Sequence, residues 1–168
     1  NDGNDTIDAS GLQAGVIGKL TIDGGNGDET ITGGHGSDLI FGGDGHDILK
    51  GNDGNDTLDG ASGDDVLTGG QGDDTIITGD GHDTITYDGA LDGHDLVVDF
   101  AGGQDKLDLT KLFDNLGVDA GDRAGRVSII DHGNGTVDVA VDVDGNKGNG
   151  FEQTVATLQT HDPINLGQ

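Results

Sequence analysis

The sequence predicts an all-β fold in which short strands alternate with glycine-rich loops. Three observations lead to this prediction. Seven uninterrupted nine-residue repeats run from Gly24 to Thr86, and each approximates G-G-x-G-x-D-x-U-x, where U is a large aliphatic residue. Glycine supplies the positive φ angles of tight loops, and 35 of the 168 residues are glycine. The T-U-x segment favours a short strand that directs one aliphatic side chain to one face.

The acidic and aliphatic positions stay in phase through the whole array. Position six of the successive repeats is occupied by Glu29, Asp38, Asp47, Asp56, Asp65, Asp74 and Asp83. Position eight is occupied by Ile31, Ile40, Leu49, Leu58, Leu67, Ile76 and Ile85. A solvated linker does not need an aliphatic side chain at every ninth position, so the pattern favours a folded array.

The repeat continues in altered form at both ends. Asp2–Asp8 is a truncated unit with its acid at Asp5, and Ala9–Asp23 is lengthened by six residues and lacks the acid. Tyr87–Val98 is a further lengthened unit with Asp95 in the acidic position. Ten units can therefore be counted, and we expect residues 1–98 to form one repeat domain.

Charge and composition restrict the kinds of partner. The chain has 33 acidic and 7 basic residues, a net charge of −26, and 30% hydrophobic residues. This charge repels nucleic acids and anionic membrane surfaces and attracts cations. The absence of cysteine excludes disulfides and thiolate metal sites, and no apolar run is long enough for membrane insertion. Because the sequence lacks methionine and begins within a repeat, we expect a monomeric fragment of a larger protein.

The nonapeptide resembles the RTX calcium-binding repeat over roughly the first 98 residues. The resemblance implies a parallel β-roll with two nonapeptides per turn. Residues 18 apart in the sequence would then stack at the ~4.8 Å spacing of adjacent strands. Two columns of acids would result, with Asp38, Asp56 and Asp74 on one side and Asp5, Glu29, Asp47, Asp65 and Asp83 on the other.

Calcium is the cation that such columns favour. Carboxylates stacked about 5 Å apart repel each other by about 1 kcal/mol in water and about 3 kcal/mol at an effective dielectric constant of ~20. A hard divalent cation between them reverses the sign of this interaction. A flexible site made only of oxygen atoms suits calcium better than magnesium or zinc. We therefore expect calcium to be part of the folded core.

The resemblance further implies that each ion is shared by two loops of one column, with about five to seven ions in all. The implied acidic pairs are Asp5 with Glu29, Glu29 with Asp47, Asp47 with Asp65, Asp65 with Asp83, Asp38 with Asp56, Asp56 with Asp74, and Asp74 with Asp95. The implied backbone carbonyl ligands belong to Gly34, Gly36, Gly43, Gly45, Asn52, Gly54, Gly63, Gly70, Gly72, Gly79 and Gly81.

Other candidate chemistry is limited. Loop positions three and five, beside the acids, carry His35, His46, His82 and His94. We expect these histidines to be solvent-exposed, with accessory transition-metal binding as the alternative. No H-E-x-x-H motif, catalytic triad or strand–phosphate-loop–helix order occurs, so the sequence predicts no enzymatic activity.

The outward positions of one predicted sheet are apolar. They carry Leu39, Phe41, Ile77, Leu96 and Val98. An exposed apolar stripe is an aggregation hazard, so we expect the C-terminal segment or a preceding domain to pack on it, whereas scattered surface aliphatics are the alternative.

A second, β-rich unit is expected over residues 99–168, where the nine-residue period ends. A short helix is predicted at Thr110–Leu116, ended by Gly117. Three strands are predicted, the first two joined by a hairpin turn at His132–Gly135: Val127–Ile130, Thr136–Val143 and Phe151–Leu158. The loop Asp144–Gly148 faintly resembles a calcium loop, but an ordinary turn is expected.

The stretch Asp99–Leu109, D-F-x-x-G-x-D-x-L-D-L, and the later T-V-A-T-L resemble the C-terminal target region of type I secreted bacterial proteins, especially large RTX adhesins. The resemblance implies that residues 99–168 cap the roll and lie near the signal read by an ABC-type secretion machinery. The protein would then be secreted, extracellular or on the cell surface, as part of an adhesin. The alternative parent is an exported protease, lipase or polysaccharide-modifying enzyme with its catalytic residues upstream.

Overall fold

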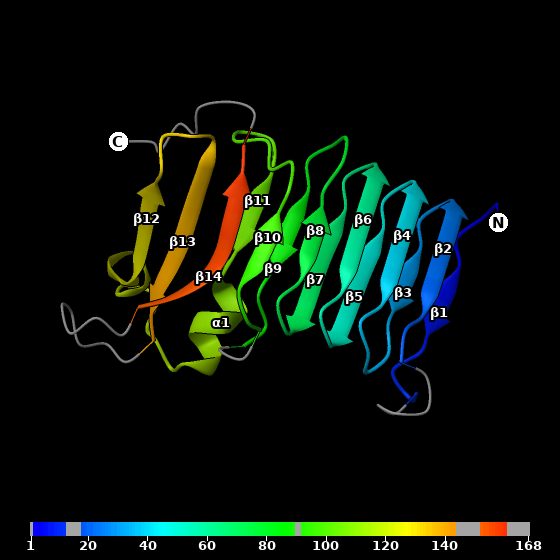
Figure 1. Ribbon diagram of the computed structural model, residues 1–168, viewed down its shortest axis with the longest axis horizontal. Helices are drawn as coiled ribbons and strands as arrows, with labels where there is room; N and C mark the ends of the chain where they lie inside the picture. Colours follow the sequence, from blue (N-terminus) through cyan, green and yellow to red (C-terminus); the bar gives the residue numbers. More distant parts are fainter. Residues whose placement is uncertain (1, 13–17, 90–91, 144–151, 161–168) are drawn as a thin grey trace.

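The computed structural model describes the chain except for residues 1, 13–17, 90–91, 144–151 and 161–168. The chain winds as a flattened solenoid, and its successive strands alternate between two facing sheets (Figure 1). The six-stranded sheet has the order β1 (Thr6–Asp8), β3 (Thr30–Thr32), β5 (Ile48–Asp53), β7 (Val66–Gln71), β9 (Thr84–Thr86) and β11 (Lys106–Asp108). The eight-stranded sheet has the order β12 (Val127–Asp131), β13 (Thr136–Asp142), β14 (Glu152–Gln159), β10 (Asp95–Val97), β8 (Thr75–Ile77), β6 (Thr57–Ser62), β4 (Leu39–Asp44) and β2 (Thr21–Asn26).

The register of the strands confirms a parallel β-roll with two nonapeptides per turn. Leu49 of β5 lies opposite Ile31 of β3 on one side and Leu67 of β7 on the other, so equivalent residues of successive turns are neighbours. Their separation in the sequence is 18 in the regular turns. It rises to 24 at the N-terminal end and to 21 and 22 at the C-terminal end, where the lengthened units add residues to the loops.

Each sheet of the roll contributes a single layer of aliphatic side chains to the interior. Every position-eight residue of the array is 0% exposed, as the pattern predicts: Ile31, Ile40, Leu49, Leu58, Leu67, Ile76 and Ile85. Each turn of two nonapeptides therefore contributes two aliphatic side chains to the core. Burial of one such side chain stabilises the fold by about 2 kcal/mol, which is little for a segment of nine residues that must be ordered.

The roll extends beyond the boundary predicted at residue 98. β11 pairs in parallel with β9, and Leu107 lies opposite Ile85 in the same register as the earlier turns. The segment Asp99–Asp105 is therefore the loop of one more turn, and stacking of strands continues to Asp108.

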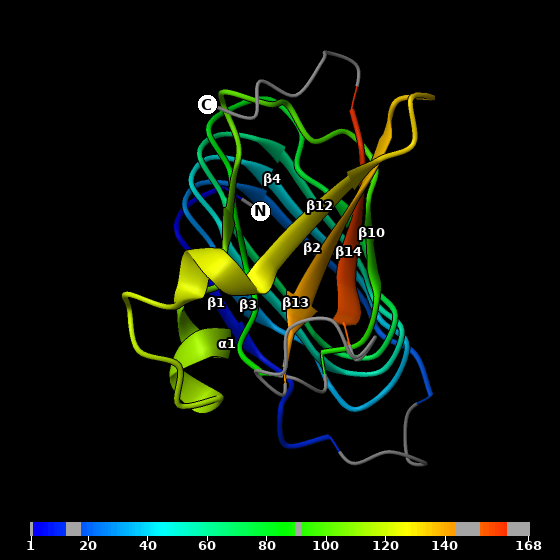
Figure 2. The same cartoon turned by 90° about the vertical axis from the view of Figure 1, so that its left-hand side faces the viewer.

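The C-terminal unit closes the end of the roll. It contains α1 (Thr110–Asn115), a 3₁₀ turn at Arg123–Arg126 and the antiparallel strands β12, β13 and β14, in agreement with the predicted helix and strands. β14 also pairs in parallel with β10, so the unit continues the eight-stranded sheet. Figure 2 views the molecule from this end, where β12 and β13 cross in front of the stacked turns. Leu112 and Phe113 of α1 are buried in the same core cluster as the roll.

Edge pairing, rather than packing on a sheet face, attaches this unit. In the described residues it pairs with β10 at the end of the roll, whereas the outward side chains of Leu39 and Phe41 lie on β4 and are half-buried. The unpaired backbone groups at the edge of β10 offer a row of hydrogen bonds that an aliphatic face does not. The predicted turn at Asp144–Gly148 lies outside the described residues. Within the described parts of the chain, no helix is long and apolar enough to cross a membrane.

Candidate metal centre

The acids at position six form two columns, one along each side of the roll. In the first column the backbone N–H of each acid donates to Oδ1 of the acid in the next turn. The N···O distances are 2.7 Å from Glu29 to Asp47, 2.8 Å from Asp47 to Asp65, and 2.8 Å from Asp65 to Asp83. The loops of successive turns therefore place these carboxylates directly next to one another.

The second column repeats the arrangement on the other side. The N···O distances are 2.7 Å from Asp38 to Asp56, 2.8 Å from Asp56 to Asp74, and 3.0 Å from Asp74 to Asp95. The last of these spans the lengthened loop after β9, so the added residues leave the column in register. Both columns thus have the neighbour relations that the sequence predicts.

The second carboxylate oxygen is buried without a partner in most of these residues. The unpartnered atoms of the columns are both carboxylate oxygens of Glu29 and Oδ2 of Asp47, Asp56, Asp65, Asp74 and Asp83. All six residues are at most 2% exposed. A buried polar atom without a hydrogen bond costs about 1 to 3 kcal/mol, and more when it is charged. Both columns therefore require positive charge to be stable as carboxylates.

The pKa values of the acids reflect the same lack of positive charge around the buried carboxylates. Burial raises the pKa of Asp56 and Asp65 to about 7 and those of Asp74 and Asp83 to about 6. Burial raises the pKa of Asp95 to about 8, while the N–H of Asp74, which donates to its Oδ1, opposes the rise. Neighbouring carboxylates add to each of these shifts. Without a cation, the folded columns thus keep part of their protons up to near neutral pH.

Backbone carbonyls approach the columns because the loops are stacked closely. Gly45 has φ of 135°, and a Cβ there would overlap the carbonyl oxygen of Gly27 in the preceding turn. The predicted carbonyl ligands with positive φ are Gly43, Gly45, Asn52, Gly54, Gly63, Gly70, Gly72, Gly79 and Gly81. Asn52 is not a glycine, and its side chain donates to the Gly33 carbonyl at 2.7 Å, which stabilises this conformation.

Position one of the repeat leaves space for the free carboxylate oxygen, a role that the sequence analysis missed. A Cβ on Gly51 would overlap Oδ2 of Asp56 and lie 2.5 Å from the carbonyl oxygen of Gly69. The φ of Gly51 is not positive, so the backbone conformation alone does not require glycine. The available signal was that position one is glycine in the first six of the seven repeats, because a residue kept without a side chain indicates restricted space.

The donor set fits a hard cation. It combines anionic carboxylate oxygens that have no donor with carbonyl oxygens of neighbouring loops, and flexible sites of this kind suit calcium. No cluster of three or more histidine or acidic side chains in the described part of the chain has the geometry of a metal site. A site between two turns must therefore take several of its ligands from the backbone.

Comparison with protein families agrees with this chemistry. A family model for the RTX calcium-binding nonapeptide repeat (4 copies) matches residues 23–58 and again residues 50–85. Residues 23–85 form an RTX calcium-binding β-roll. No curated protein matches the chain in sequence.

The N-terminal turns of the RTX roll depart from the regular pattern. Oδ1 of Asp38 accepts the N–H of Leu20 at 2.8 Å, as in the regular turns, but Leu20 has no carboxylate to contribute to the column. Oδ2 of Asp38 accepts the N–H of Gly34 at 2.7 Å, so this carboxylate has no free oxygen. Gly34 and Gly36, two predicted carbonyl ligands, lack the positive φ of the other loops.

Glu29 replaces the usual aspartate of the RTX repeat. Burial raises its pKa, and the negative charges of Asp47 and Asp5 raise it further, so Asp5 stands in the column where the sequence predicts it. Both of its side-chain oxygens are buried without a partner. At Glu29 the first column therefore has an especially large need for a cation.

Two further acids of the RTX roll were missed from the sequence. The N–H of Asp83 donates to Oδ1 of Asp105 at 3.2 Å, which continues the first column by one turn. The carboxylate of Asp99 accepts the N–H of Thr78 at 2.8 Å and closes the adjacent loop. The signal was present in Gly103–Asp108, G-Q-D-K-L-D, which matches the second half of the nonapeptide.

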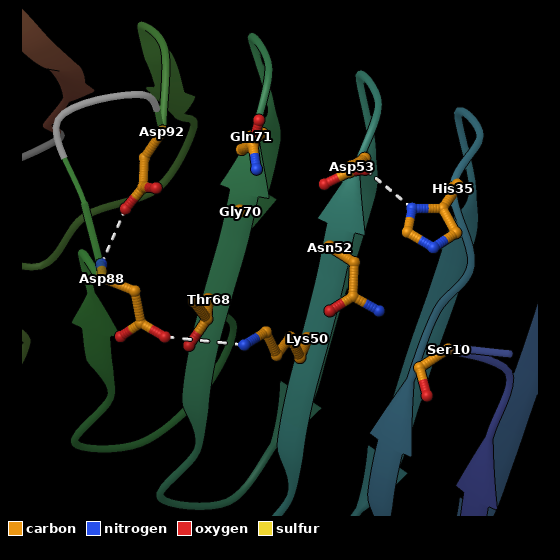
Figure 3. Close-up of a pocket in the computed structure, with 10 residues that line it drawn as sticks. All are labelled: Ser10, His35, Lys50, Asn52, Asp53, Thr68, Gly70, Gln71, Asp88 and Asp92. Atoms are coloured by element: carbon orange, nitrogen blue, oxygen red, sulfur yellow. Dashed lines mark hydrogen bonds and ion pairs between the residues drawn. The ribbon is translucent and has the colours of Figure 1, made fainter. Parts of the chain in front are cut away.

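The loop histidines lie outside the columns. The three that are exposed, as predicted, are His46, His82 and His94. His35 is half-buried, and its Nδ1 lies 2.7 Å from Oδ2 of Asp53 at one end of a polar groove of about 240 Å³ (Figure 3). At the other end, Nζ of Lys50 lies 3.5 Å from Asp88. These four side chains of the groove thus pair with one another, and Asp92 accepts the N–H groups of Asp88 and Gly89.

Proposed function

We propose that this chain is a non-catalytic module whose folding depends on calcium and which supports the export of a larger protein. The buried, unpartnered oxygens stacked in two columns carry this proposal. Where calcium is scarce, as in the cytosol, these columns and the net charge of −26 favour an expanded chain. At the millimolar calcium concentrations outside the cell, sites of the extracellular type are filled and the chain folds.

The proposed export route is a type I, ABC-type secretion machinery. An expanded chain suits passage through a narrow exporter, and folding outside prevents its return. Support comes from the calcium-binding repeats and from the resemblance of residues 99–168 to secretion target regions. The parent we propose is a cell-surface adhesin, and the module stays monomeric and extracellular in this role. Secretion of the chain by a host with and without such an exporter tests the route.

Calcium-dependent folding is tested by far-ultraviolet circular dichroism and small-angle X-ray scattering. We expect an expanded chain with little β-structure in chelator and a compact β-rich one in calcium. Magnesium at equal concentration serves as the control for ionic strength and should fold the chain poorly, because it prefers rigid octahedral sites. A chain that is compact and β-rich in chelator would refute the proposed function.

A further inference from the structure

A second ladder of hydrogen bonds runs beside each acid column, through the side chains at position five of the repeat. In the first column, Oδ1 of Asp28 accepts the N–H of His46 at 3.0 Å. Nδ1 of His46 accepts the N–H of Asp64 at 2.8 Å, and Oδ1 of Asp64 accepts the N–H of His82 at 2.9 Å. Each side chain at position five therefore binds the backbone of position five in the next turn.

The same ladder occurs beside the second column with different residue types. Oγ of Ser37 accepts the N–H of Asn55 at 3.3 Å, and Oδ1 of Asn55 accepts the N–H of Asp73 at 3.2 Å. Oδ1 of Asp73 accepts the N–H of His94 at 3.1 Å. Serine, asparagine, aspartate and histidine differ in charge and shape. They share a hydrogen-bond acceptor within short reach of the backbone.

The two ladders act in opposite directions along the roll. Between one pair of turns, the N–H of Asp56 donates forward to the side chain of Asp74 at 2.8 Å. Between the same turns, the N–H of Asp73 donates back to the side chain of Asn55 at 3.2 Å. Adjacent residues of two loops thus exchange reciprocal hydrogen bonds, and this exchange fixes how one loop lies on the next.

We propose that the residues at position five are positioning residues for calcium binding. The bond at position six holds Oδ1 of each acid, and the bond at position five holds the loop on which the next acid lies. Together they direct the free Oδ2 into the stack and couple neighbouring sites. The residues at position five need an acceptor for this role and do not need a charge. The inference rests on the calcium-dependent folding proposed above.

The test compares substitutions that remove the acceptor with substitutions that keep it. Asn55→Leu removes the acceptor and keeps a side chain branched at Cγ, and Asn55 is exposed, so no cavity is formed. Asn55→Asp keeps the acceptor and adds a charge. Asp73→Leu and Asp73→Asn form the matched pair in which the acceptor is lost or kept while the charge is removed in both.

Two measurements separate positioning from general stability: the rate of calcium release after mixing with a chelator, and the Hill coefficient of folding in a calcium titration. We expect both leucine variants to release part of their calcium on the order of fivefold faster, as the loss of one hydrogen bond implies. Their Hill coefficients should fall, because coupling between neighbouring turns is weakened. Asn55→Asp and Asp73→Asn should stay within about twofold of the parent chain in release rate.

Equal calcium release rates in Asn55→Leu and Asn55→Asp would overturn the proposal, because the acceptor would then have no effect. An Asp73→Asn variant that releases calcium as fast as Asp73→Leu would also overturn it, because the charge of Asp73 would then determine the release rate. If Asn55→Leu does not fold at any calcium concentration, Asn55→Ser must fold, since serine already supplies the acceptor at Ser37. The parent chain in chelator tests calcium dependence by itself. The proposed function and the role of position five can therefore fail independently.

Discussion

Replacing Asp65 by asparagine removes one charge from the middle of the first column and preserves most of its contacts. An asparagine can still accept the N–H of Asp47, which Oδ1 of Asp65 accepts at 2.8 Å. It loses the anionic Oδ2 that is buried without a partner. Asp65 lies between Asp47 and Asp83, so under the proposed function the substitution weakens two adjacent calcium sites.

The size of the effect follows from the affinity of such sites. A site with a dissociation constant of about 10⁻⁴ to 10⁻³ M contributes about 0.6 to 2 kcal/mol at about 2 mM free calcium. Loss of two sites should therefore lower the free energy of unfolding of Asp65→Asn by about 1 to 4 kcal/mol. Urea unfolding in calcium, followed by circular dichroism, measures this difference.

Without calcium, Asp65→Asn should raise the free energy of unfolding instead of lowering it. Burial raises the pKa of Asp65 to about 7, so above that pH the ion-free fold contains a buried charge that asparagine does not have. In chelator, with trimethylamine oxide added to favour compact states, Asp65→Asn should fold more readily than the parent chain.

The control removes the same charge one residue away. Asp64 is exposed, and asparagine there keeps the acceptor for His82. Asp64→Asn should change the free energy of unfolding by less than about 0.5 kcal/mol in calcium. Equal losses in Asp64→Asn and Asp65→Asn would refute the reasoning, because net charge and not the buried oxygen would then be responsible.

Three other predictions concern the core, the loops and pH. Leu58 is 0% exposed, and Leu58→Ala should lower the free energy of unfolding in calcium by about 2 to 4 kcal/mol in a urea melt. Gly51→Ala should raise the calcium midpoint of folding, because its Cβ would overlap Oδ2 of Asp56, whereas Gly121→Ala has open space and should not. Burial raises the pKa of Asp56 from 3.8 to about 7 and that of Asp95 to about 8, so the ion-free fold is most stable at low pH and loses stability as pH rises from about 4 to about 8. Calcium binding at pH 7 should therefore release protons, and calorimetry in buffers of different ionisation enthalpy should detect them.

The repeated part of the fold was predictable because each residue stacks on copies of itself. The aliphatic side chain of Leu58 and the acid of Asp56 follow from their positions in the nonapeptide alone. Asp105 was missed because the loop before it shifts the phase of the repeat. Asp38 differs because its Oδ2 accepts the N–H of Gly34 in the same loop, where Gly34 lacks the positive φ of the other loops, and the repeat pattern does not predict this difference.

The C-terminal unit shows where local patterns stop being informative. The turn at His132–Gly135 predicts the hairpin of β12 and β13, because glycine and asparagine suit tight turns. Nothing local predicts that Leu96 of β10 lies opposite Thr157 of β14. That pairing satisfies backbone groups at a sheet edge, and backbone groups are the same for every sequence.

The roll combines contacts that favour folding without calcium and contacts that oppose folding until calcium binds. The aliphatic core and the reciprocal hydrogen bonds, such as that from Asp73 to Asn55, stabilise the folded turns and need no ion as a partner. The free oxygens of acids such as Asp56 and Asp74 oppose folding until an ion binds them. Because the first set is small per repeat and the second recurs in almost every turn, the balance between them changes sign with calcium. Folding of one turn also places its acid beside the acid of the next turn, so this change should spread along the stack as a single transition.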